Sequence, residues 1–482
     1  MTNSVQRIAN NTFFSLGSKT IELVSGVIII VMAARYLGVE QFGQYAFIRS
    51  IGFILSAFIA MGSLRIMVRD ISVHQEKAGS IMASGIILRC ITGTVVLIGV
   101  YLFLPVLDLQ SNILVQGLFV AICSQILMDM TLAVYAGFTG FERMKFNFGV
   151  TLINRSVLII LFILVIIYDF EIIGLFLSLF LANLLAFILA LSLLHKKFFV
   201  LKFSTAFKGL INLLRSSYPL AITALLIQGH MNVNVFFLKY YQEFEQISYF
   251  QAPQRIIIPL ILISQSLLVS FLPVLSRMAH NKDIADFIGI YHSILKGIVI
   301  FTLPIILFVT LDAKHIIYMV FGIEYQPAVL SLQVLIWTLL PAFINSLLQY
   351  VLIIKQKEKK LIIGSSICLI VNTLLSILLI PQYGYIGASF SFMFSFISLC
   401  CVNMYFVSME AITYGDSKLM IKVLTLSLVS LAFILFYSEH VSSLISHVLL
   451  FILLSALFLI LNIVTHADKA MIQKAFRLYF EN

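Results

Sequence analysis

Apolar stretches of membrane-spanning length fill this chain almost from end to end. A transmembrane helix needs about 20 mostly apolar residues to cross roughly 30 Å of hydrocarbon, and about fourteen such stretches occur. The gaps between them are too short for a soluble domain of ordinary size. The stretches lie near residues 12–34, 44–64, 81–104, 112–137, 147–168, 173–194, 217–238, 250–272, 290–311, 327–350, 361–380, 385–408, 419–437 and 444–465. Any function must therefore reside largely within the bilayer.

The composition and pattern of the stretches indicate helices rather than strands. Of the 482 residues, 61% are hydrophobic and 11% are charged, and the mean hydropathy is +1.07. Only α-helices and closed barrels satisfy the backbone inside lipid, and the alternating ten-residue strands of a barrel are absent. We predict an all-α polytopic protein with membrane lipids as its immediate partners. The five cysteines all fall within spans and indicate neither a disulfide nor a metal site.

The basic residues report on topology rather than on nucleic-acid binding. The net charge of +10 comes mainly from loops on the side of the N-terminus, including the run KQKEKK at 355–360. The only lysine and arginine residues in the opposite loops are Arg35, Lys239 and Lys314. Under the positive-inside rule, we expect both termini in the cytoplasm, which requires an even number of helices.

Two pairs of short segments indicate an internal repeat. ARYLGVEQFGQY at 34–45 resembles LKYYQEFEQISYF at 238–250, and YDFEIIG at 168–174 resembles PQYGYIG at 381–387. The alternative is chance similarity between short aromatic loops. Six helices per copy is an even number, so the copies have the same orientation, as in transporters whose substrate path follows the interface of parallel halves.

The repeat predicts the domain organisation. We expect two parallel, pseudo-symmetric six-helix lobes, at residues 1–200 and 201–410. Residues 411–482 would add two transmembrane helices and a cytoplasmic tail.

Ionisable residues inside the predicted spans are the best candidates for a functional site. Each costs about 2.5–3.5 kcal/mol at mid-membrane, so it usually faces a wet cavity or a partner. The set comprises the cations Lys19, Arg49, Arg89, Arg155, Arg255 and Lys296 and the acids Glu22 and Asp129. This basic interior suits an anion such as a phosphate or pyrophosphate, because guanidinium groups offer bidentate hydrogen bonds.

The cations differ in depth. Arg49, Arg255 and Lys296 lie within a few turns of an interface, where they either line a cavity or snorkel out of the membrane. Arg89 and Arg155 lie deeper, so we expect both to face a cavity.

The acids leave two interpretations open. Asp129 is either a proton or sodium site or the structural counter-ion of an arginine. Glu22 stands three residues after Lys19 and can pair with it, and we include it with Asp129 as a candidate for ion coupling.

Two spans are unusually polar. The run QGHMNVN at 228–234 indicates an interrupted or cavity-lining helix, and we include its Asn232 and Asn234 as candidate substrate contacts. The span 327–350 carries a polar stripe that either contacts substrate or joins helices by hydrogen bonds, with packing the favoured interpretation.

The sequence lacks the motifs of cofactor or metal chemistry. GSKT at 17–20 resembles the end of a phosphate-binding loop, but the first glycine is missing and the segment opens a span. The outer loops are too short for a catalytic domain. We expect no cofactor and no enzymatic activity. Transport would draw on an ion gradient, the membrane potential or the substrate gradient.

Five short motifs occur in order along the chain: ARYLGVEQFGQY at 34–45, GFERMK at 140–145, FLPVLSR at 271–277, FGIEY at 321–325 and PQYGYIGA at 381–388. Together with the topology, they resemble the polysaccharide biosynthesis (Wzx-type) flippases of the multidrug/oligosaccharidyl-lipid/polysaccharide exporter superfamily.

The resemblance implies a two-lobed fold like that of multidrug exporters. It also implies flipping of undecaprenyl-pyrophosphate-linked oligosaccharide across the bacterial plasma (inner) membrane for O-antigen, capsule or exopolysaccharide. Alternating access, with or without proton or sodium antiport, would be the mechanism. Arg89 and Arg155 would bind the head group, with Arg49, Lys19 and Lys296 secondary.

Several alternatives remain within this resemblance and beyond it. A lipid II flippase and a cationic drug antiporter belong to the same superfamily, and a membrane-embedded polymerase is the alternative from another class. A drug antiporter should prefer an acidic cavity, so the sign of the charge argues against it. A separate polysaccharide polymerase and a chain-length regulator would be further partners of a flippase.

Overall fold

The structure is a computed structural model, and it describes residues 2–410 apart from 108, 110, 204–205, 270, 272–274 and 279–283. These residues form α-helices and short 3-10 helices, without a β-strand among them, which confirms the predicted all-α fold. The spans predicted at 419–437 and 444–465 lie outside the described residues, as does the whole predicted region 411–482.

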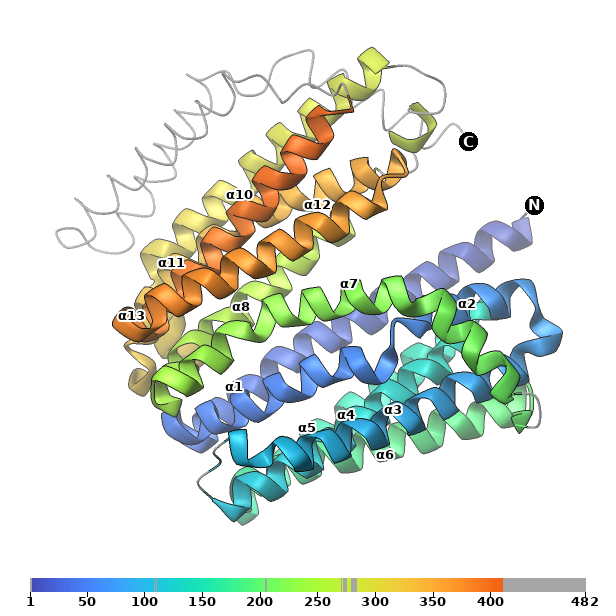
Figure 1. Cartoon of the computed structure of the whole chain (residues 1–482), viewed down its shortest axis with the longest axis horizontal. Coiled ribbons are helices and arrows are strands. Elements are labelled where there is room, and N and C mark those ends of the chain that lie inside the picture. Colours follow the sequence, from blue (N-terminus) through green and yellow to red (C-terminus); the bar gives the residue numbers. More distant parts are fainter. Residues whose placement is uncertain are drawn as a thin grey trace. The chain divides into compact units, whose positions relative to one another are not determined.

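The chain divides into two compact units. The first comprises Met1–Lys239 and Glu243–Ser248, and the second comprises Tyr240–Gln242 and Tyr249–Asn482. The first unit contains α1 (Thr2–Ala60), α2 (Ser63–Val73), α3 (Ala78–Leu107), α4 (Asn112–Gly140), α5 (Lys145–Tyr168), α6 (Glu171–Lys197) and nearly all of α7 (Ala206–Tyr241). The second contains most of α8 (Phe244–Val269), with α10 (Ile284–Val320), α11 (Ala328–Leu335), α12 (Leu339–Ile354) and α13 (Glu358–Ser408) (Figure 1). This division groups α7 with the first unit, and the lobe boundary near residue 200 stays a prediction.

Ten helical segments of the described chain are long and apolar enough to cross a membrane. Two of them, Asn10–Val73 and Glu358–Ser408, hold two predicted spans each, so the ten account for every span predicted before residue 410. Inside α1 and α13, the chain bends at Gly38 (φ 69°) and Gly384 (φ 53°). Glycine adopts a positive φ readily, and these bends replace the loops expected there.

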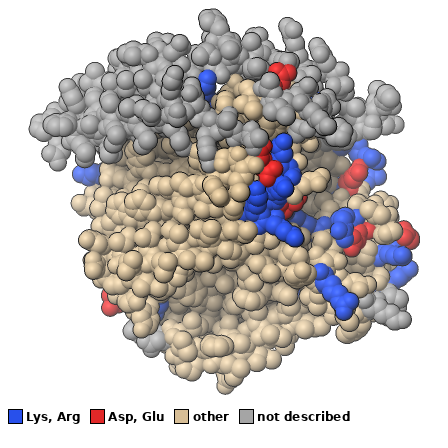
Figure 2. Space-filling model, turned by 45° about the horizontal axis from the view of Figure 1, so that its top comes forward, with Lys and Arg blue, Asp and Glu red and all other residues tan. Residues whose placement is uncertain are grey.

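The outer surface of the helices is largely apolar. For example, α3 exposes Val95, Leu102, Phe103 and Val106. In Figure 2, charged side chains gather toward the right of the view and leave a broad uncharged surface to the left. Lipid chains are as apolar as these side chains, so apolar burial gives little drive for helix association within a membrane. Polar contacts between helices therefore have added weight.

Such contacts occur in both units. In the first, Asn154 Nδ2 of α5 donates to Asn183 Oδ1 of α6 (3.1 Å), and Asn183 Nδ2 donates to Ser124 Oγ of α4 (3.0 Å). In the second, Asn403 Nδ2 of α13 donates to Asn345 Oδ1 of α12 (2.6 Å). Asn345 belongs to the polar stripe of span 327–350, and its hydrogen bond joins two helices, as the packing interpretation of that stripe predicts.

The segments that indicated the repeat contact each other in a corresponding way in each half. The Tyr36 hydroxyl of α1 donates to Asp169 Oδ1 (2.7 Å), at the turn between α5 and α6. In the second unit, Gln242 Nε2 donates to the carbonyl oxygen of Ile380 (3.2 Å), directly before the segment 381–387. In each half, a hydrogen bond thus joins the turn after the first span of that half to the end of its fifth span.

Two of these segments also contact each other reciprocally within the first unit. When their shared Glu-Gln pairs are aligned, Gly43 is equivalent to Ser248, and Val39 is equivalent to Phe244. Gly43 lies against the carbonyl group of Phe244, and Ser248 Oγ donates to the carbonyl oxygen of Val39. Each position therefore touches the main chain of the other repeat segment.

Gly43→Ala is expected to destabilise the fold by about 1–3 kcal/mol, the usual cost of overpacking, because the added Cβ would collide with the Phe244 carbonyl group. Gly26→Ala is the matched control on the same helix, since its added Cβ meets nothing within 4 Å and alanine favours a helix. Thermal unfolding of the purified protein in detergent should separate the two variants. Equal unfolding temperatures would contradict the reciprocal contact.

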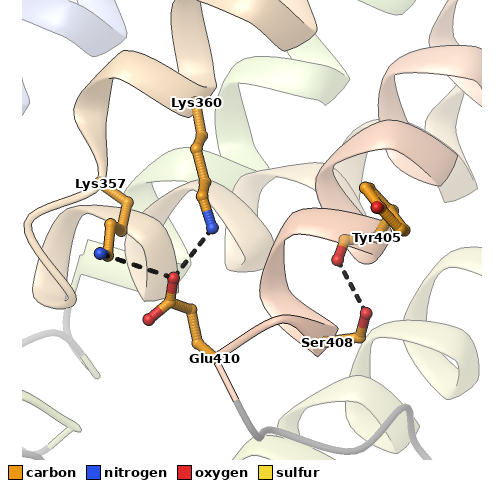
Figure 3. Close-up of polar contacts among 5 residues, drawn as sticks. All are labelled: Lys357, Lys360, Tyr405, Ser408 and Glu410. Atoms are coloured by element: carbon orange, nitrogen blue, oxygen red, sulfur yellow. Dashed lines mark hydrogen bonds and ion pairs between the residues drawn. The ribbon is translucent and has the colours of Figure 1, made fainter.

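An ion pair joins the two ends of α13, which approach because the helix bends at Gly384. Lys360 Nζ donates to Glu410 Oε1 (2.9 Å), and Lys357 Nζ lies 3.9 Å from the same oxygen (Figure 3). Next to them, Ser408 Oγ donates to the carbonyl oxygen of Tyr405 (2.7 Å). The hydrogen bond from Lys360 holds the pKa of Glu410 below its ordinary value.

Glu410→Gln should lower the unfolding free energy by about 1 kcal/mol or less at neutral pH. Because the folded pKa is lowered, the carboxylate contributes fully above the ordinary glutamate pKa, and the contribution is lost as the pH falls through the folded pKa. Thermal unfolding in detergent should show a gap between wild type and variant that closes in acid. Glu358→Gln, at the exposed start of α13, is the control; a gap of equal size there would exclude the Lys360 pairing as its cause.

Candidate functional site

Four of the ionisable residues predicted from the sequence lie together in the first unit, and we call them the basic cluster. Lys19 and Glu22 are on the first half of α1, Arg49 is on its second half, and Arg155 is on α5, which packs against α1. Arg155 interacts electrostatically with Glu22 and Arg49, and Glu22 interacts with Lys19. The basic cluster thus holds three cations and one carboxylate within membrane-spanning segments.

One hydrogen-bond donor of Arg155 is unsatisfied. Its Nε is buried and has no hydrogen-bond partner, whereas buried donors are normally satisfied. Glu22 attracts the guanidinium group, but Arg49 repels it. An anion bound here would accept from Nε and reduce the repulsion between the two arginines.

The basic cluster is open to the surroundings on the α1 side. Lys19 and Glu22 are exposed, and Arg49 is half-buried. The Arg49 guanidinium carbon lies 4.7 Å from the centroid of the Phe53 ring, which orients it by a cation–π contact. Charges exposed on a membrane helix must meet water, a head group or a ligand, so the α1 side is where an anion would approach the basic cluster.

Arg89 and Asp129 form a separate, enclosed group. Each side chain is only 1% exposed. Arg89 Nε donates to the main-chain oxygen of Asp129 (2.9 Å), and its Nη1 donates to that of Gly85 (3.0 Å). The Asp129 carboxylate accepts from Ser56 Oγ (3.0 Å) and Gln125 Nε2 (3.4 Å).

The expected cavity-facing position of Arg89 is therefore not observed, because main-chain carbonyl groups satisfy its guanidinium inside the protein. Asp129 and Arg89 also attract each other electrostatically, which is the arrangement of a structural counter-ion. Binding of a head group by Arg89 and ion coupling by Asp129 stay predictions.

The remaining candidates lie on α7, α8 and α10. The interruption expected at 228–234 is absent, since α7 is continuous there, and Asn232 Nδ2 donates to the Gln228 carbonyl oxygen one turn earlier (2.9 Å). Asn234 is fully buried. Arg255 and Lys296 belong to the second unit and are half-buried. Within the described part of the chain, no three His, Cys, Asp or Glu residues are grouped as metal ligands.

Tyr135 of α4 joins the basic cluster although the sequence did not single it out. It interacts electrostatically with Glu22 and Arg155, and its hydroxyl lies 3.1 Å from Thr151 Oγ1. A tyrosine near the end of a span is usually part of the interfacial aromatic belt, so its position gave no functional signal.

Residues 8–279 match the family described as polysaccharide biosynthesis protein. The chain belongs to this family. The match confirms the resemblance carried by the short motifs. A comparison with curated proteins found no match.

Solved structures establish the fold of this polysaccharide biosynthesis protein. The lipid II flippase MurJ, in an inward closed conformation, is similar with a TM-score of 0.72 at 18% identity, over 93% of this chain and 98% of that one. An inward-facing multidrug resistance MATE family transporter of the MOP superfamily gives 0.69 at 14% identity, over 81% and 94%. A MOP superfamily transporter from Pyrococcus furiosus gives 0.56 at 14% identity, over 84% and 95%. The chain is thus a multi-pass membrane protein with a MOP transporter fold.

Arg89→Leu should cost about 3–5 kcal/mol of unfolding free energy, because it leaves the buried Asp129 carboxylate without its cation. Arg89→Leu combined with Asp129→Asn should recover part of that loss. The measurements are protein yield in membranes and thermal unfolding in detergent. A stable single variant with lost transport would instead assign Arg89 to the substrate path.

Proposed function

We propose that this polysaccharide biosynthesis protein is a flippase for undecaprenyl-pyrophosphate-linked oligosaccharide. It would move the repeat unit from the inner to the outer leaflet of the bacterial plasma membrane, for O-antigen, capsule or exopolysaccharide. Family membership and a fold shared with a lipid II flippase support the reaction class. The basic cluster is the observation that carries the substrate class.

The pyrophosphate is the part of this substrate that fits the basic cluster. It is a compact polyanion, and Arg155 and Arg49 supply two guanidinium groups that can bind phosphate oxygens in a bidentate way. The unpartnered Nε of Arg155 provides a donor without breaking an existing bond. Lys19 adds a flexible charge at the exposed edge, and the lipid tail can remain in the membrane.

Glu22 gives the site a way to release its anion. It attracts Lys19 and Arg155 electrostatically, so it would compete with the pyrophosphate for the same cations. A proton or sodium ion on Glu22 would remove that competition and favour binding. We therefore place ion coupling at Glu22 first, because Asp129 is enclosed. Arg255, Lys296, Asn232 and Asn234 are proposed as later contacts during alternating access.

The distribution of basic loops supports cytoplasmic termini in a bacterial inner membrane. In that compartment, a polysaccharide polymerase and a chain-length regulator would receive the flipped repeat units.

Other functions of the superfamily are weaker candidates. The similarity to MurJ favours a lipid II flippase as the second candidate. A cationic drug antiporter would have to attract cations into a site that holds three cations and one acid. The Pyrococcus furiosus transporter is described as a MOP protein whose reverse pocket polarity suggests a different function. A polymerase would be revealed if purified protein elongated a lipid-linked glycan.

Deletion of the gene tests the function directly. Loss of surface polysaccharide, with repeat units trapped on the cytoplasmic leaflet, supports the proposal. Rescue of peptidoglycan synthesis in a strain depleted of its lipid II flippase would favour the second candidate. Unchanged glycan with new sensitivity to cationic drugs would move the protein to the multidrug branch.

Arg155→Leu should abolish surface glycan while the protein level in the membrane holds, because it removes the donor aimed at the anion. Arg155→Lys should retain a fraction of export, since a point charge remains but the bidentate geometry is lost. Complementation of the deletion strain, with immunoblotting for protein, is the measurement. Arg65→Gln, an exposed arginine of α2, is the matched control. Wild-type glycan from the Arg155→Leu strain would exclude the basic cluster as the anion site.

A further inference from the structure

A second candidate binding site lies in the second unit. It is a pocket of about 460 Å³, within the roughly 300–1,000 Å³ of small-molecule sites. Its lining residues come from the C-terminal part of α10, the start of α11 and the bend of α13. Its polar lining consists of Lys314, Gln326, Gln333 and Tyr385, and the apolar wall lies between Pro327 and Leu330.

Two of the polar residues are held in place by neighbours. Gln333 Nε2 donates to the carbonyl oxygen of Thr310 (3.1 Å), which turns the amide so that its Oε1 is left as an acceptor. The Tyr385 ring packs against Tyr249 with ring centroids 5.4 Å apart. Amide groups donate and accept as sugar hydroxyls do, and a tyrosine ring offers an apolar face beside a polar tip.

Tyr385 has no aromatic counterpart in the other half of the repeat. In the repeat, the segment 381–387 corresponds to 168–174, and Ile172 stands at the position of Tyr385. Gly387 and its equivalent Gly174 both sit in tight contacts, although Gly387 meets the main chain of Leu379 and Ile380 and Gly174 meets the side chains of Val165 and Phe170. The aromatic side chain belongs to the second half alone, which points to a role in binding.

Lys314 departs from the charge distribution of the chain. It is one of three basic residues in the loops predicted to lie outside, and it is exposed at the pocket. A cation placed against the positive-inside pattern at a pocket with two amides and a tyrosine suits an acidic sugar.

We infer that this pocket binds a uronic acid residue of the transported glycan. Tyr385 supports the pyranose ring, Gln326 and Gln333 bond to its hydroxyl groups, and Lys314 pairs with its carboxylate. The inference rests on the proposed function, because the cargo supplies the sugar, and it adds that the cargo is an acidic glycan.

Saturation-transfer NMR on the purified full-length protein tests the pocket without requiring transport. The probes are free glucuronate and galacturonate, with glucose and galactose at matched ionic strength. We expect saturable binding of a sugar acid, and Lys314→Gln should weaken it about tenfold, the effect of losing one charge-assisted hydrogen bond. Tyr385→Leu should also weaken it. Tyr383→Leu and His315→Gln, exposed neighbours that do not line the pocket, should leave it unchanged.

Three outcomes would overturn the inference: no saturable binding of either sugar acid, equal binding of the neutral sugars with no effect of Lys314→Gln, or binding that persists in both pocket variants. The same wild-type protein is assayed for export in the deletion strain. Intact export without sugar-acid binding would reject the pocket inference alone. Failed export by the wild type would reject the proposed function.

Discussion

Inside lipid, a buried polar group without a partner costs free energy, and this constraint separates the charges of this protein into two kinds. The Arg89 guanidinium is enclosed and bonded to main-chain carbonyl groups, with Asp129 as its counter-ion. Arg155, in contrast, keeps a buried Nε that no protein group accepts from. The first arrangement is complete without a ligand and stabilises helix packing. The second is incomplete, and an anion would complete it. Burial and hydrogen bonding, rather than depth in the membrane, therefore distinguish the enclosed Arg89 from Arg155, the arginine that we propose binds the anion.

Much of the fold and part of the site could be predicted from the sequence. The apolar spans before residue 410 were located because lipid demands long apolar helices, and Lys19, Glu22, Arg49 and Arg155 stood out because charges in such helices are rare. The orientation of Arg89 could not be predicted, because a sequence records which span holds a charge but not which carbonyl groups lie beside it. The bends at Gly38 and Gly384 were also missed. A single glycine with positive φ reverses the chain where a loop was expected. The polar and aromatic residues next to each glycine are of the types that are common in loops.

The two halves of the repeat share backbone geometry and differ in their side-chain chemistry. Gly43 and Ser248 occupy equivalent positions and each touches the main chain of the other copy, which requires small side chains at both sites. Gly174 and Gly387 are likewise equivalent, and an added Cβ would meet a close neighbour at either position. At the corresponding turn, however, the first half has Ile172 where the second half has Tyr385. Backbone packing thus constrains both copies alike, while positions outside these contacts are free to acquire separate binding roles.

On the proposed function, this divergence divides recognition of the substrate. The pyrophosphate is the same for every undecaprenyl-linked cargo, so the basic cluster would supply affinity without selecting the glycan. The sugar residues differ between cargoes, so the pocket of the second unit would supply selectivity. A transporter must also release what it binds, and several guanidinium contacts to a polyanion would by themselves hold the cargo too tightly. Glu22 would counter this, because it attracts the same cations, Arg155 and Lys19. On this proposal, one acid among three cations would give an affinity high enough for capture and low enough for release.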